Sequence, residues 1–252
     1  MAAGEQRALV TGAGAPGGIG MAVARRLARA GLEVAITATT ARIHDRAAEL
    51  RAEGFIASGH VADLTDPVQV AALRAAVGPV AVLVNNAGMG SINAPSEARL
   101  FLATDLAQWT HGLETSLTTA FLVTRAFLPD MVAAGWGRVV MMASVTGPLV
   151  SNPGETAYSA AKAGMVGLTH ALALEVARAG VTVNAVAPGW IATEAATELE
   201  ARAALHTPPG RAGTADEVAA VAAFLASRDA SYVNGVCWVV DGGNLLQEHK
   251  GS

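Results

Sequence analysis

The sequence predicts a single-domain α/β fold, in which a parallel seven-stranded sheet carries helices on both faces. Three observations support this prediction. Short runs rich in valine and isoleucine alternate with longer stretches of helical periodicity. The short runs are almost continuously apolar, as expected of strands that are buried on both faces of a parallel sheet. The chain has 252 residues, of which 52% are hydrophobic and 15% are charged, and this fits one domain with a large core.

Seven strands and six helices follow from these patterns. The expected strands are residues 8–11, 34–37, 56–61, 80–84, 138–143, 182–187 and 236–240. The expected helices are residues 20–30, 43–53, 67–77, 110–134, 156–179 and 215–227. Asp66 before Pro67 fits an N-cap with proline at the first helical position. Gly31, Gly54 and Gly180 follow helix ends, where a left-handed residue is favoured. The alternation implies parallel strands joined by right-handed crossovers.

Two stretches, residues 89–108 and 189–213, show no regular pattern. Both are long for connections within a compact domain, so we expect them to line a binding site. No internal repeat or linker divides the chain, and residues 1–252 are expected to form one domain. Its core would span residues 7–243, followed by a polar tail at residues 244–252.

The composition argues against several classes of protein. The net charge of -4 and the scattered arginines provide no basic surface for nucleic acid. No apolar run reaches the ~18 residues of a membrane span, and the polar start of the chain does not resemble a signal peptide. The lone Cys237 excludes an internal disulfide and suits a reducing compartment. The six histidines lack metal-ligand spacing. We therefore expect a cytoplasmic protein without a metal site, a nucleic-acid partner or a membrane partner.

Tyr158 and Lys162 form the most informative pair of residues. The chain has only two tyrosines and two lysines, so a tyrosine four residues before a lysine arises by chance in roughly 2% of such sequences. In a helix these two side chains share one face. An ammonium beside a phenol favours the phenolate and is expected to lower the pKa of Tyr158 toward neutral pH. Such a tyrosine can exchange a proton with a substrate oxygen. The alternative is an incidental pair on a surface helix.

A glycine-rich segment, TGAGAPGGIG at residues 11–20, follows the first strand and opens the first helix. In this context glycines let the backbone approach a pyrophosphate, and the helix N-terminus offers free N–H groups. The segment therefore predicts a dinucleotide site, and the alternative is a purely structural turn. The residues assigned to it are Thr11, Gly12, Gly14, Gly17, Gly18, Ile19 and Gly20.

The end of the second strand bears on the choice of cofactor. A carboxylate near this point usually binds the ribose hydroxyls of NAD, and residues 37–42 contain none. A 2′-phosphate would meet no repulsion there, and Thr37, Thr39 and Arg42 are candidates to bind it. The sequence thus favours NADP(H). NAD(H) is the alternative, and Arg42 would then be an ordinary solvated residue at a helix start.

Five motifs in this order resemble the short-chain dehydrogenase/reductase family. They are the glycine-rich loop, Asn85-Asn86-Ala87-Gly88, Ser144, Tyr158-x-x-x-Lys162 and Pro188-Gly189. The resemblance covers about residues 7–243 and implies a single-domain Rossmann fold. Within the family the chain is most similar to the reductases named for 3-oxoacyl-acyl carrier protein, through residues 37–39, 114–115, 183–189 and 224–227.

The resemblance implies roles for the matching residues. Tyr158 would be the general acid in carbonyl reduction, Lys162 would assist it and bind the nicotinamide ribose, and Ser144 would donate to the substrate oxygen. The other residues assigned to the cofactor are Asp63 and Leu64 beside the adenine, Asn86, Ala87 and Gly88 on the ribose side, and Pro188, Gly189, Ile191 and Thr193 near the carboxamide. The structural alternatives are a strand-end cap for Ser144, a turn for Asn86 and a solvated loop carboxylate for Asp63.

The chain departs from the family pattern at three points. The glycine loop is two residues longer, around Ala15-Pro16. The family's relay asparagine is replaced by Ser116, which we keep as a fourth catalytic candidate because a water can bridge the shorter side chain. Where carrier-protein reductases place basic residues beside the active-site entrance, this chain has Trp136 and Ala179. That difference argues against an acidic carrier protein as partner.

The expected function is NADPH-dependent reduction of a ketone or β-keto ester to a secondary alcohol. Residues 89–108, 145–156 and 190–206 would form an apolar pocket for a small carbonyl substrate. The alternatives are an NAD-dependent secondary alcohol dehydrogenase, a 3-oxoacyl thioester reductase, and a nucleotide-binding protein without catalysis. The family commonly forms tetramers through the helices expected at residues 110–134 and 156–179, so a homotetramer is expected.

Overall fold

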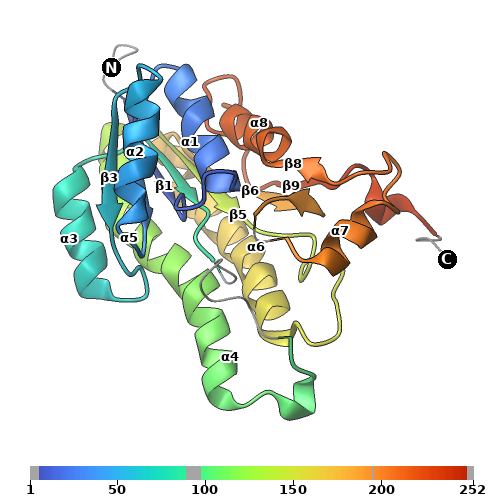
Figure 1. The fold of residues 1–252 in the computed structure, drawn as a ribbon. Coiled ribbons are helices and arrows are strands. Elements are labelled where there is room, and N and C mark those ends of the chain that lie inside the picture. The colour runs from blue at the N-terminus through green and yellow to red at the C-terminus, as the bar shows by residue number, and fades with distance from the viewer. Residues whose placement is uncertain (1–5, 89–97, 195, 249–252) are drawn as a thin grey trace.

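A seven-stranded parallel sheet forms the centre of the protein (Figure 1). The computed structural model describes residues 6–88, 98–194 and 196–248. The strands lie in the order β3-β2-β1-β4-β5-β6-β9, and every neighbouring pair is parallel. Their bounds are β1 Arg7–Thr11, β2 Glu33–Ala38, β3 Ala57–Val61, β4 Val82–Asn85, β5 Gly137–Met142, β6 Val181–Pro188 and β9 Cys237–Val240. The strand order reverses between β1 and β4, and α/β proteins bind their ligands at the carboxyl ends of the strands at such a point.

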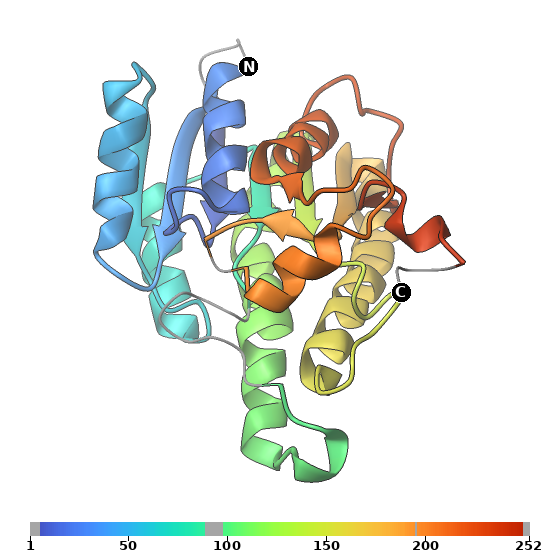
Figure 2. The same ribbon diagram turned by 45° about the vertical axis from the view of Figure 1, so that its right-hand side comes forward.

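Helices cover both faces of the sheet (Figures 1 and 2). One face carries α1 (Ile19–Arg29), α2 (Arg42–Ala52) and α8 (Ala215–Leu225). The other carries α3 (Pro67–Val77), α5 (Thr119–Ala134) and α6 (Thr156–Val176), which continues into the 3-10 turn η3 (Ala177–Ala179). Successive strand residues alternate between the two cores, as the pleat requires. In β1, Val10 joins the first core and Leu9 the second, and both are fully buried.

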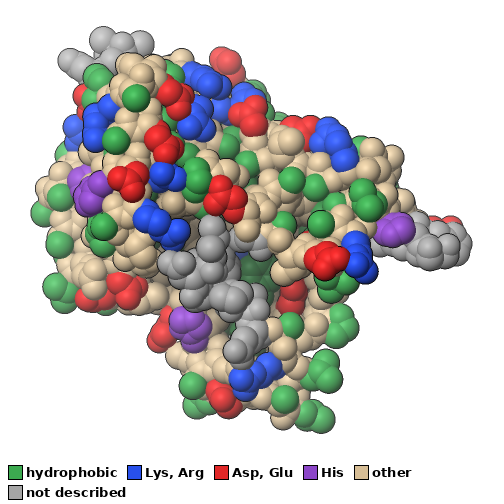
Figure 3. All heavy atoms as spheres, viewed as in Figure 1, with side chains coloured by type: hydrophobic (Ala, Val, Ile, Leu, Met, Phe, Trp, Pro, Cys, Tyr) green, Lys and Arg blue, Asp and Glu red, His purple; other side chains and the backbone are tan. Residues whose placement is uncertain are grey.

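A long helical rod runs from Leu106 to Ala134 and extends beyond the sheet (Figure 2), and exposed hydrophobic side chains lie at its projecting end (Figure 3). It consists of α4 (Leu106–Leu113), a π-helical turn η2 (Glu114–Thr118) and α5. The rod is long and apolar enough to cross a membrane by length and composition alone. Val123, Phe127 and Met131 are nevertheless buried against the sheet, and a core helix meets the same criterion.

Residues 98–113 form an arm that contains the 3-10 turn η1 (Phe101–Ala103) and α4. This arm contains more regular structure than the sequence predicts. Of residues 89–108, those at 89–97 lie outside the described residues. The turn η1 precedes α4, and α4 starts four residues earlier than expected. The reason is a capping box: Asp105 accepts from the backbone N–H of Gln108, and Gln108 accepts from the N–H of Asp105.

The second irregular stretch also contains regular structure. Helix α7 (Glu198–Ala204) begins at another capping box, between Thr197 and Glu200. Two short strands, β7 (Ile191–Ala192) and β8 (Gly213–Thr214), pair in parallel and bring the two ends of the stretch together. A last 3-10 turn, η4 (Asn244–Leu246), lies in the segment expected to be a tail.

The predicted helix ends are confirmed where local chemistry dictates them. The carboxylate of Asp66 accepts a 2.8 Å hydrogen bond from the N–H of Val68, directly after Pro67. Gly31, Gly54 and Gly180 have φ angles of +89°, +91° and +71°. These values lie in the left-handed region, which glycine enters without strain.

Candidate active site

Every residue assigned to the site from the sequence lies at or just beyond the carboxyl end of a strand, or on a helix that faces it. The glycine loop follows β1, and Thr37 and Arg42 bracket the end of β2. Asn86 follows β4, Ser144 follows β5 and Gly189 follows β6. Because these strands are parallel, their ends converge on one edge of the sheet.

The glycine loop packs tightly against the segment that follows β4. The hydroxyl of Thr11 accepts hydrogen bonds of 2.9 Å from the N–H groups of Asn86 and Ala87. The side chain of Asn86 donates to the carbonyls of Thr11 and Gly12, at 3.1 and 3.0 Å. A Cβ on Gly12, whose φ is +68°, would lie 2.8 Å from the Cα of Ala87, and one on Gly20 would lie 2.6 Å from Asn86 Nδ2. The side chains of Thr11 and Asn86 therefore hold the glycine loop in place and do not point toward a ligand. Asn86 does more than form a turn, which was the structural alternative.

The loop leaves a helix N-terminus without a side-chain cap. Gly18 is the N-cap of α1, and no side chain among the described residues caps the free N–H groups of the first turn. The hydrogen bond from Gly18 N–H to the carbonyl of Ala15, at 3.1 Å, closes the longer loop on itself. Such an N-terminus binds anions through its amides and the helix dipole. Gly14 lies at the β2 side of the loop, where a Cβ would be 3.0 Å from Ala38.

The end of β2 presents one free basic side chain. Arg42 is exposed at the first position of α2, donates to Thr40 at 3.4 Å, and forms no ion pair within the part of the chain that the structure describes. Thr39 is also exposed. Thr37, in contrast, is fully buried, and its hydroxyl has no hydrogen-bond partner among the described residues. Thr39 and Arg42 could therefore meet a ligand directly, whereas Thr37 faces the interior.

The two residues assigned to the adenine behave differently from each other. The carboxylate of Asp63 is exposed and accepts from the N–H and the hydroxyl of Thr65, at 2.9 and 2.7 Å. Its backbone N–H donates to the side chain of Gln69 at 2.9 Å. The side chain of Leu64 is buried in the second core. Leu64 can therefore contact a ligand through its backbone at most.

Ser144, Tyr158 and Lys162 come together between β5 and α6. Ser144 is buried, its hydroxyl accepts from the N–H of Thr146 at 3.1 Å, and it lies close enough to Tyr158 to lower the pKa of the phenol. Lys162 lies one helical turn after Tyr158, with Nζ 5.6 Å from the centre of the phenol ring. The ammonium donates to the carbonyl of Met142 at 2.7 Å. The structure thus places a hydroxyl, a phenol and a cation at one point.

The loop between β5 and α6 holds this arrangement in place. Gly147 has a φ of +108°, and a Cβ there would lie 2.3 Å from the carbonyl of Ser159. Only glycine fits a backbone conformation and an approach of this kind. The hydroxyls of Ser151 and Ser159 lie 2.6 Å apart and tie the loop to the first turn of α6. Ser144 and Tyr158 are therefore held by backbone packing on both sides.

Burial controls the proton affinities in this trio. It raises the pKa of Tyr158, and the hydrogen bond with Ser144 opposes that shift. The carboxylates of Glu155 and Glu200 raise the pKa of Tyr158 further by charge repulsion. Burial also lowers the pKa of Lys162 from 10.5 to about 8. The pKa of Tyr158 is therefore raised overall and not lowered toward neutral pH as expected, because desolvation of the phenol prevails.

Ser116 lies in the π-helical turn and is fully buried. Two observations bring it to the trio: a Cβ on Gly88 would lie 3.6 Å from Ser116 Oγ and 3.5 Å from Lys162 Nζ. Both polar atoms thus border the same space beside Gly88. Turns of this kind occur frequently at functional sites, and the catalytic role of Ser116 stays a prediction.

The segment after β6 completes the edge. Pro188 is buried and its carbonyl accepts from Val145 N–H at 3.0 Å. A Cβ on Gly189 would lie 2.7 Å from the Cβ of Asp241. Ile191 packs on the first core from β7, and Thr193 follows it, half-buried.

Three glutamates near the site were not expected from the sequence. Glu155 precedes α6, three residues before Tyr158, and accepts from the side chain of Asn152 at 3.1 Å. Glu200 lies in the first turn of α7. Glu194 accepts a 3.3 Å hydrogen bond from the N–H of Gly17. Spacing along the helix would have identified Glu155, and the T-x-x-E pattern of a capping box would have identified α7.

The argument against a carrier protein, which was drawn from Trp136 and Ala179, needs a correction. Trp136 directly precedes β5, and Ala179 lies two residues before the start of β6. They therefore lie at the opposite end of the sheet from Ser144 and not beside the active-site entrance. The ring of Trp136 also lies between two cations, with Arg138 and Arg228 at 4.6 and 5.1 Å from its centre. The lack of charge at these two positions does not decide whether a carrier protein binds.

The edge as a whole fits a nicotinamide dinucleotide. Gly12 and Gly20 let the glycine loop pack closely on itself and on the segment after β4, and the N-terminus of α1 that follows the loop suits a pyrophosphate. Within the described residues no group of histidine, cysteine or carboxylate side chains could hold a metal ion.

Comparison with known proteins gives a consistent result. A family model described as "Enoyl-(Acyl carrier protein) reductase" matches residues 12–244. The chain is 42% identical to a 3-oxoacyl-[acyl-carrier-protein] reductase of Pseudomonas aeruginosa, over 95% of this chain and 97% of the relative. It is 41% identical to a galactitol 2-dehydrogenase (L-tagatose-forming) of Cereibacter sphaeroides, over 94% and 93%.

Two solved structures are similar over nearly their whole length. A putative NAD(P)-dependent gluconate 5-dehydrogenase of Beutenbergia cavernae, with bound NADP, is 38% identical with a TM-score of 0.88, covering 96% of this chain and 98% of that one. A 3-oxoacyl-[acyl-carrier protein] reductase of Brucella melitensis, with bound NAD, is 33% identical with a TM-score of 0.88, covering 96% and 92%. The fold, the converging Ser144, Tyr158 and Lys162, and these relatives show that the chain belongs to the short-chain dehydrogenase/reductase family of NAD(P)-dependent oxidoreductases.

Proposed function

We propose that the protein uses NADPH to reduce an uncharged ketone or β-keto ester to a secondary alcohol. The observation that carries this proposal is the convergence of Ser144, Tyr158 and Lys162 between β5 and α6, with Nζ of Lys162 5.6 Å from the centre of the Tyr158 ring. Burial and two nearby carboxylates raise the pKa of the Tyr158 phenol, so the phenol keeps its proton at neutral pH. Reduction needs a proton donor, whereas oxidation of an alcohol needs the phenolate.

The chemistry divides between the cofactor and the chain. When bound, a dihydronicotinamide supplies the hydride that adds to the carbonyl carbon. Tyr158 donates its proton to the carbonyl oxygen, and the hydroxyl of Ser144 donates a hydrogen bond to the same oxygen as its negative charge develops. Lys162 is mostly protonated at pH 7, because its pKa is about 8, and its positive charge favours the phenolate that remains. Ser116, beside Lys162, would deliver a replacement proton through a water.

The preference for NADPH rests on Arg42 and Thr39. Both side chains are exposed at the end of β2, Arg42 is not engaged in an ion pair with any described residue, and no carboxylate occupies residues 37–42. A guanidinium binds a phosphate well. The two solved relatives hold NADP in one case and NAD in the other, so this preference belongs to the proposal.

The preference for an uncharged substrate rests on Glu155 and Glu200. Both carboxylates act on Tyr158 through space, and neither forms an ion pair among the described residues. A substrate carboxylate next to the reacting carbonyl would be repelled, which argues against acids such as gluconate. Leu149 and Leu205 are exposed at 53% and 64% on two of the three segments expected to form the pocket, and they suit an apolar substituent.

The test is to follow the oxidation of NADPH and of NADH separately, with aryl ketones, β-keto esters, an acyl thioester and the keto form of an aldonic acid as substrates. We expect turnover of the uncharged ketones or esters with NADPH, and a loss of about 10²- to 10⁴-fold in kcat for Tyr158→Phe. Turnover with NADH alone would contradict the cofactor preference. Efficient turnover of the acyl thioester would favour the second candidate, a 3-oxoacyl thioester reductase, to which the 42% identical relative points.

We also propose a cytoplasmic homotetramer. On α6, Ala163, Gly167 and Ala171 are exposed, and a Cβ on Gly167 would meet nothing within 4 Å. Such a small-residue face allows a second helix to approach closely. Gly164, expected on the same face, instead packs against Leu117 of the same chain. Light scattering after size-exclusion chromatography should give four times the mass of the chain, and a monomeric mass would contradict this.

A further inference from the structure

The longer glycine loop touches a carboxylate from a distant part of the chain. The N–H of Gly17 donates a 3.3 Å hydrogen bond to Oε1 of Glu194. A Cβ on Gly17 would lie 3.3 Å from that oxygen and 3.7 Å from Cγ of Glu194, so the side chain rests directly on the loop. Glu194 forms no ion pair with any described residue. The amide of Gly17 is its hydrogen-bond partner in that part of the chain.

The contact lies where an anion is favoured. Gly17 and Gly18 lead into α1, whose N-cap provides no side-chain oxygen and whose first turn contains no acidic residue. A carboxylate beside the N–H groups at the start of α1 interacts favourably with the helix dipole. A cofactor pyrophosphate needs the same amides and carries the same sign of charge. Glu194 and the pyrophosphate therefore cannot both occupy this position.

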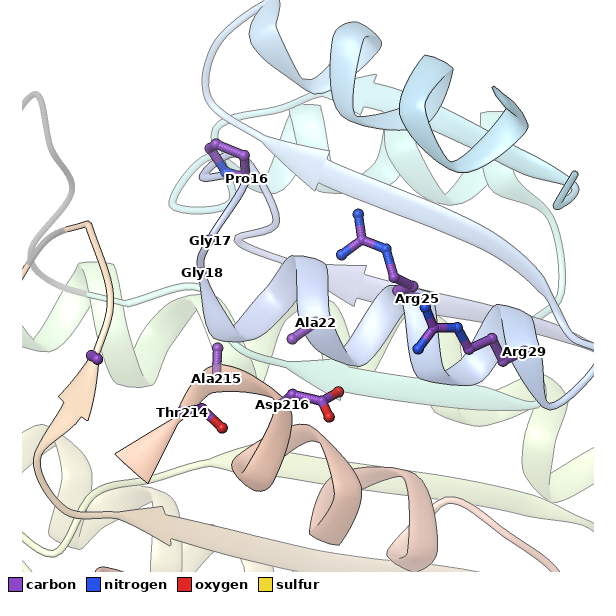
Figure 4. Close-up of a pocket in the computed structure, with 10 residues that line it drawn as sticks. Pro16, Gly17, Gly18, Ala22, Arg25, Arg29, Thr214, Ala215 and Asp216 are labelled. Atoms are coloured by element: carbon purple, nitrogen blue, oxygen red, sulfur yellow. The ribbon is translucent and has the colours of Figure 1, made fainter. Parts of the chain in front are cut away.

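The glycine loop borders open space. Gly17 and Gly18 border an open hollow of about 390 Å³, together with Ala192 from β7 and Thr214 at the start of α8 (Figure 4). The lining beside the loop consists of small side chains. Figure 4 shows the turn with Gly17 and Gly18 facing Thr214 and Ala215 across this hollow.

We propose that Glu194 is a competitor for the pyrophosphate site, whose carboxylate holds the glycine loop in the free protein and must leave when a dinucleotide binds. This inference rests on the cofactor requirement of the proposed function. Glu194 would thereby set the affinity for the cofactor without selecting between NADPH and NADH, because both share the pyrophosphate. The two extra loop residues, Ala15 and Pro16, directly precede Gly17. They therefore set the position of the amide that Glu194 contacts.

The test compares Glu194→Gln with the wild type in three binding measurements. NADPH and NADH are titrated by fluorescence, and ADP-ribose, which has the pyrophosphate but no nicotinamide, by calorimetry. We expect all three to bind about three- to tenfold more tightly in the variant, with a gain that shrinks at high salt because it arises from charge. Glu198→Gln is the matched control, since Glu198 is exposed in the same segment and pairs with Arg202 instead; it should leave all three affinities unchanged.

Unchanged or weaker binding of all three ligands to Glu194→Gln would overturn the proposal. A purely structural role for Glu194 would lower the melting temperature of the free protein without tightening any ligand. Tighter binding of ADP-ribose supports the competition even if no carbonyl of the panel is reduced. The failure of the proposed substrate class is thus distinguishable from the failure of this inference.

Discussion

Replacing Lys162 with methionine is expected to stabilise the cofactor-free protein while it abolishes turnover. Lys162 is 5% exposed, and burial lowers the pKa of its ammonium from 10.5 to about 8. One pKa unit corresponds to about 1.4 kcal/mol, so holding the charged side chain in the fold costs about 3 kcal/mol at pH 7. The substitution also removes the hydrogen bond to the carbonyl of Met142, a loss of about 1–2 kcal/mol. The free energy of unfolding should rise by the difference, about 1–2 kcal/mol.

The pH dependence of this difference makes the prediction specific. Between the folded pKa of about 8 and the unfolded pKa of 10.5, the unfolded chain binds more protons than the native protein. The stability of the wild type therefore rises with pH in this window, and the advantage of the variant should shrink by about 1 kcal/mol from pH 7 to pH 9. Urea denaturation of both proteins at the two pH values measures it. A variant less stable than the wild type at pH 7, or a difference that does not change with pH, would refute the argument that the buried charge is costly.

Three further substitutions test other parts of the site. Gly12→Ala should lower the free energy of unfolding by about 2–4 kcal/mol, because φ is +68° and the new Cβ would lie 2.8 Å from a neighbouring Cα. Gly31→Ala, at φ +89° in open space, should cost only about 1–2 kcal/mol, and equal losses in urea denaturation would contradict the close approach. Glu155→Gln should move the rising limb of the oxidative kcat/KM profile to lower pH, because the carboxylate raises the pKa of Tyr158; an unmoved profile would count against it. Arg42→Ala should weaken NADPH binding by about tenfold and leave NADH binding unchanged in fluorescence titrations, and equal effects would exclude a contact with the 2′-phosphate.

The sheet and its helices could be predicted from the sequence because their patterns are local. Apolar runs such as residues 138–143 identify strands, and Asp66 with Pro67 identifies a helix start. Helix α7 could not be predicted in the same way, since its seven residues, Glu198–Ala204, carry almost no apolar periodicity. Its capping box was the available signal.

The candidate site shows the same division. The order of the motifs was enough to bring Ser144, Tyr158 and Lys162 to one point. The direction in which the pKa of Tyr158 shifts could not be predicted, because it depends on burial, and a spacing of four residues contains no information about desolvation. The contact between Gly17 and Glu194 joins residues 177 positions apart, so no local pattern reveals it.

The π-helical turn at Glu114–Thr118 fixes how the arm, η1 and α4, is rotated about the helix axis relative to α5 and the core. A π turn holds one residue more than an α-helical turn, and one residue corresponds to about 100° of rotation. In α5 the buried positions Ala120, Val123, Thr124 and Phe127 follow helical spacing toward the sheet. Deleting one residue from the turn would rotate α4 and η1 about the helix axis and break the 3.1 Å hydrogen bond from Arg99 N–H to the carbonyl of Gly154. The arm can therefore change its length in evolution only outside this turn.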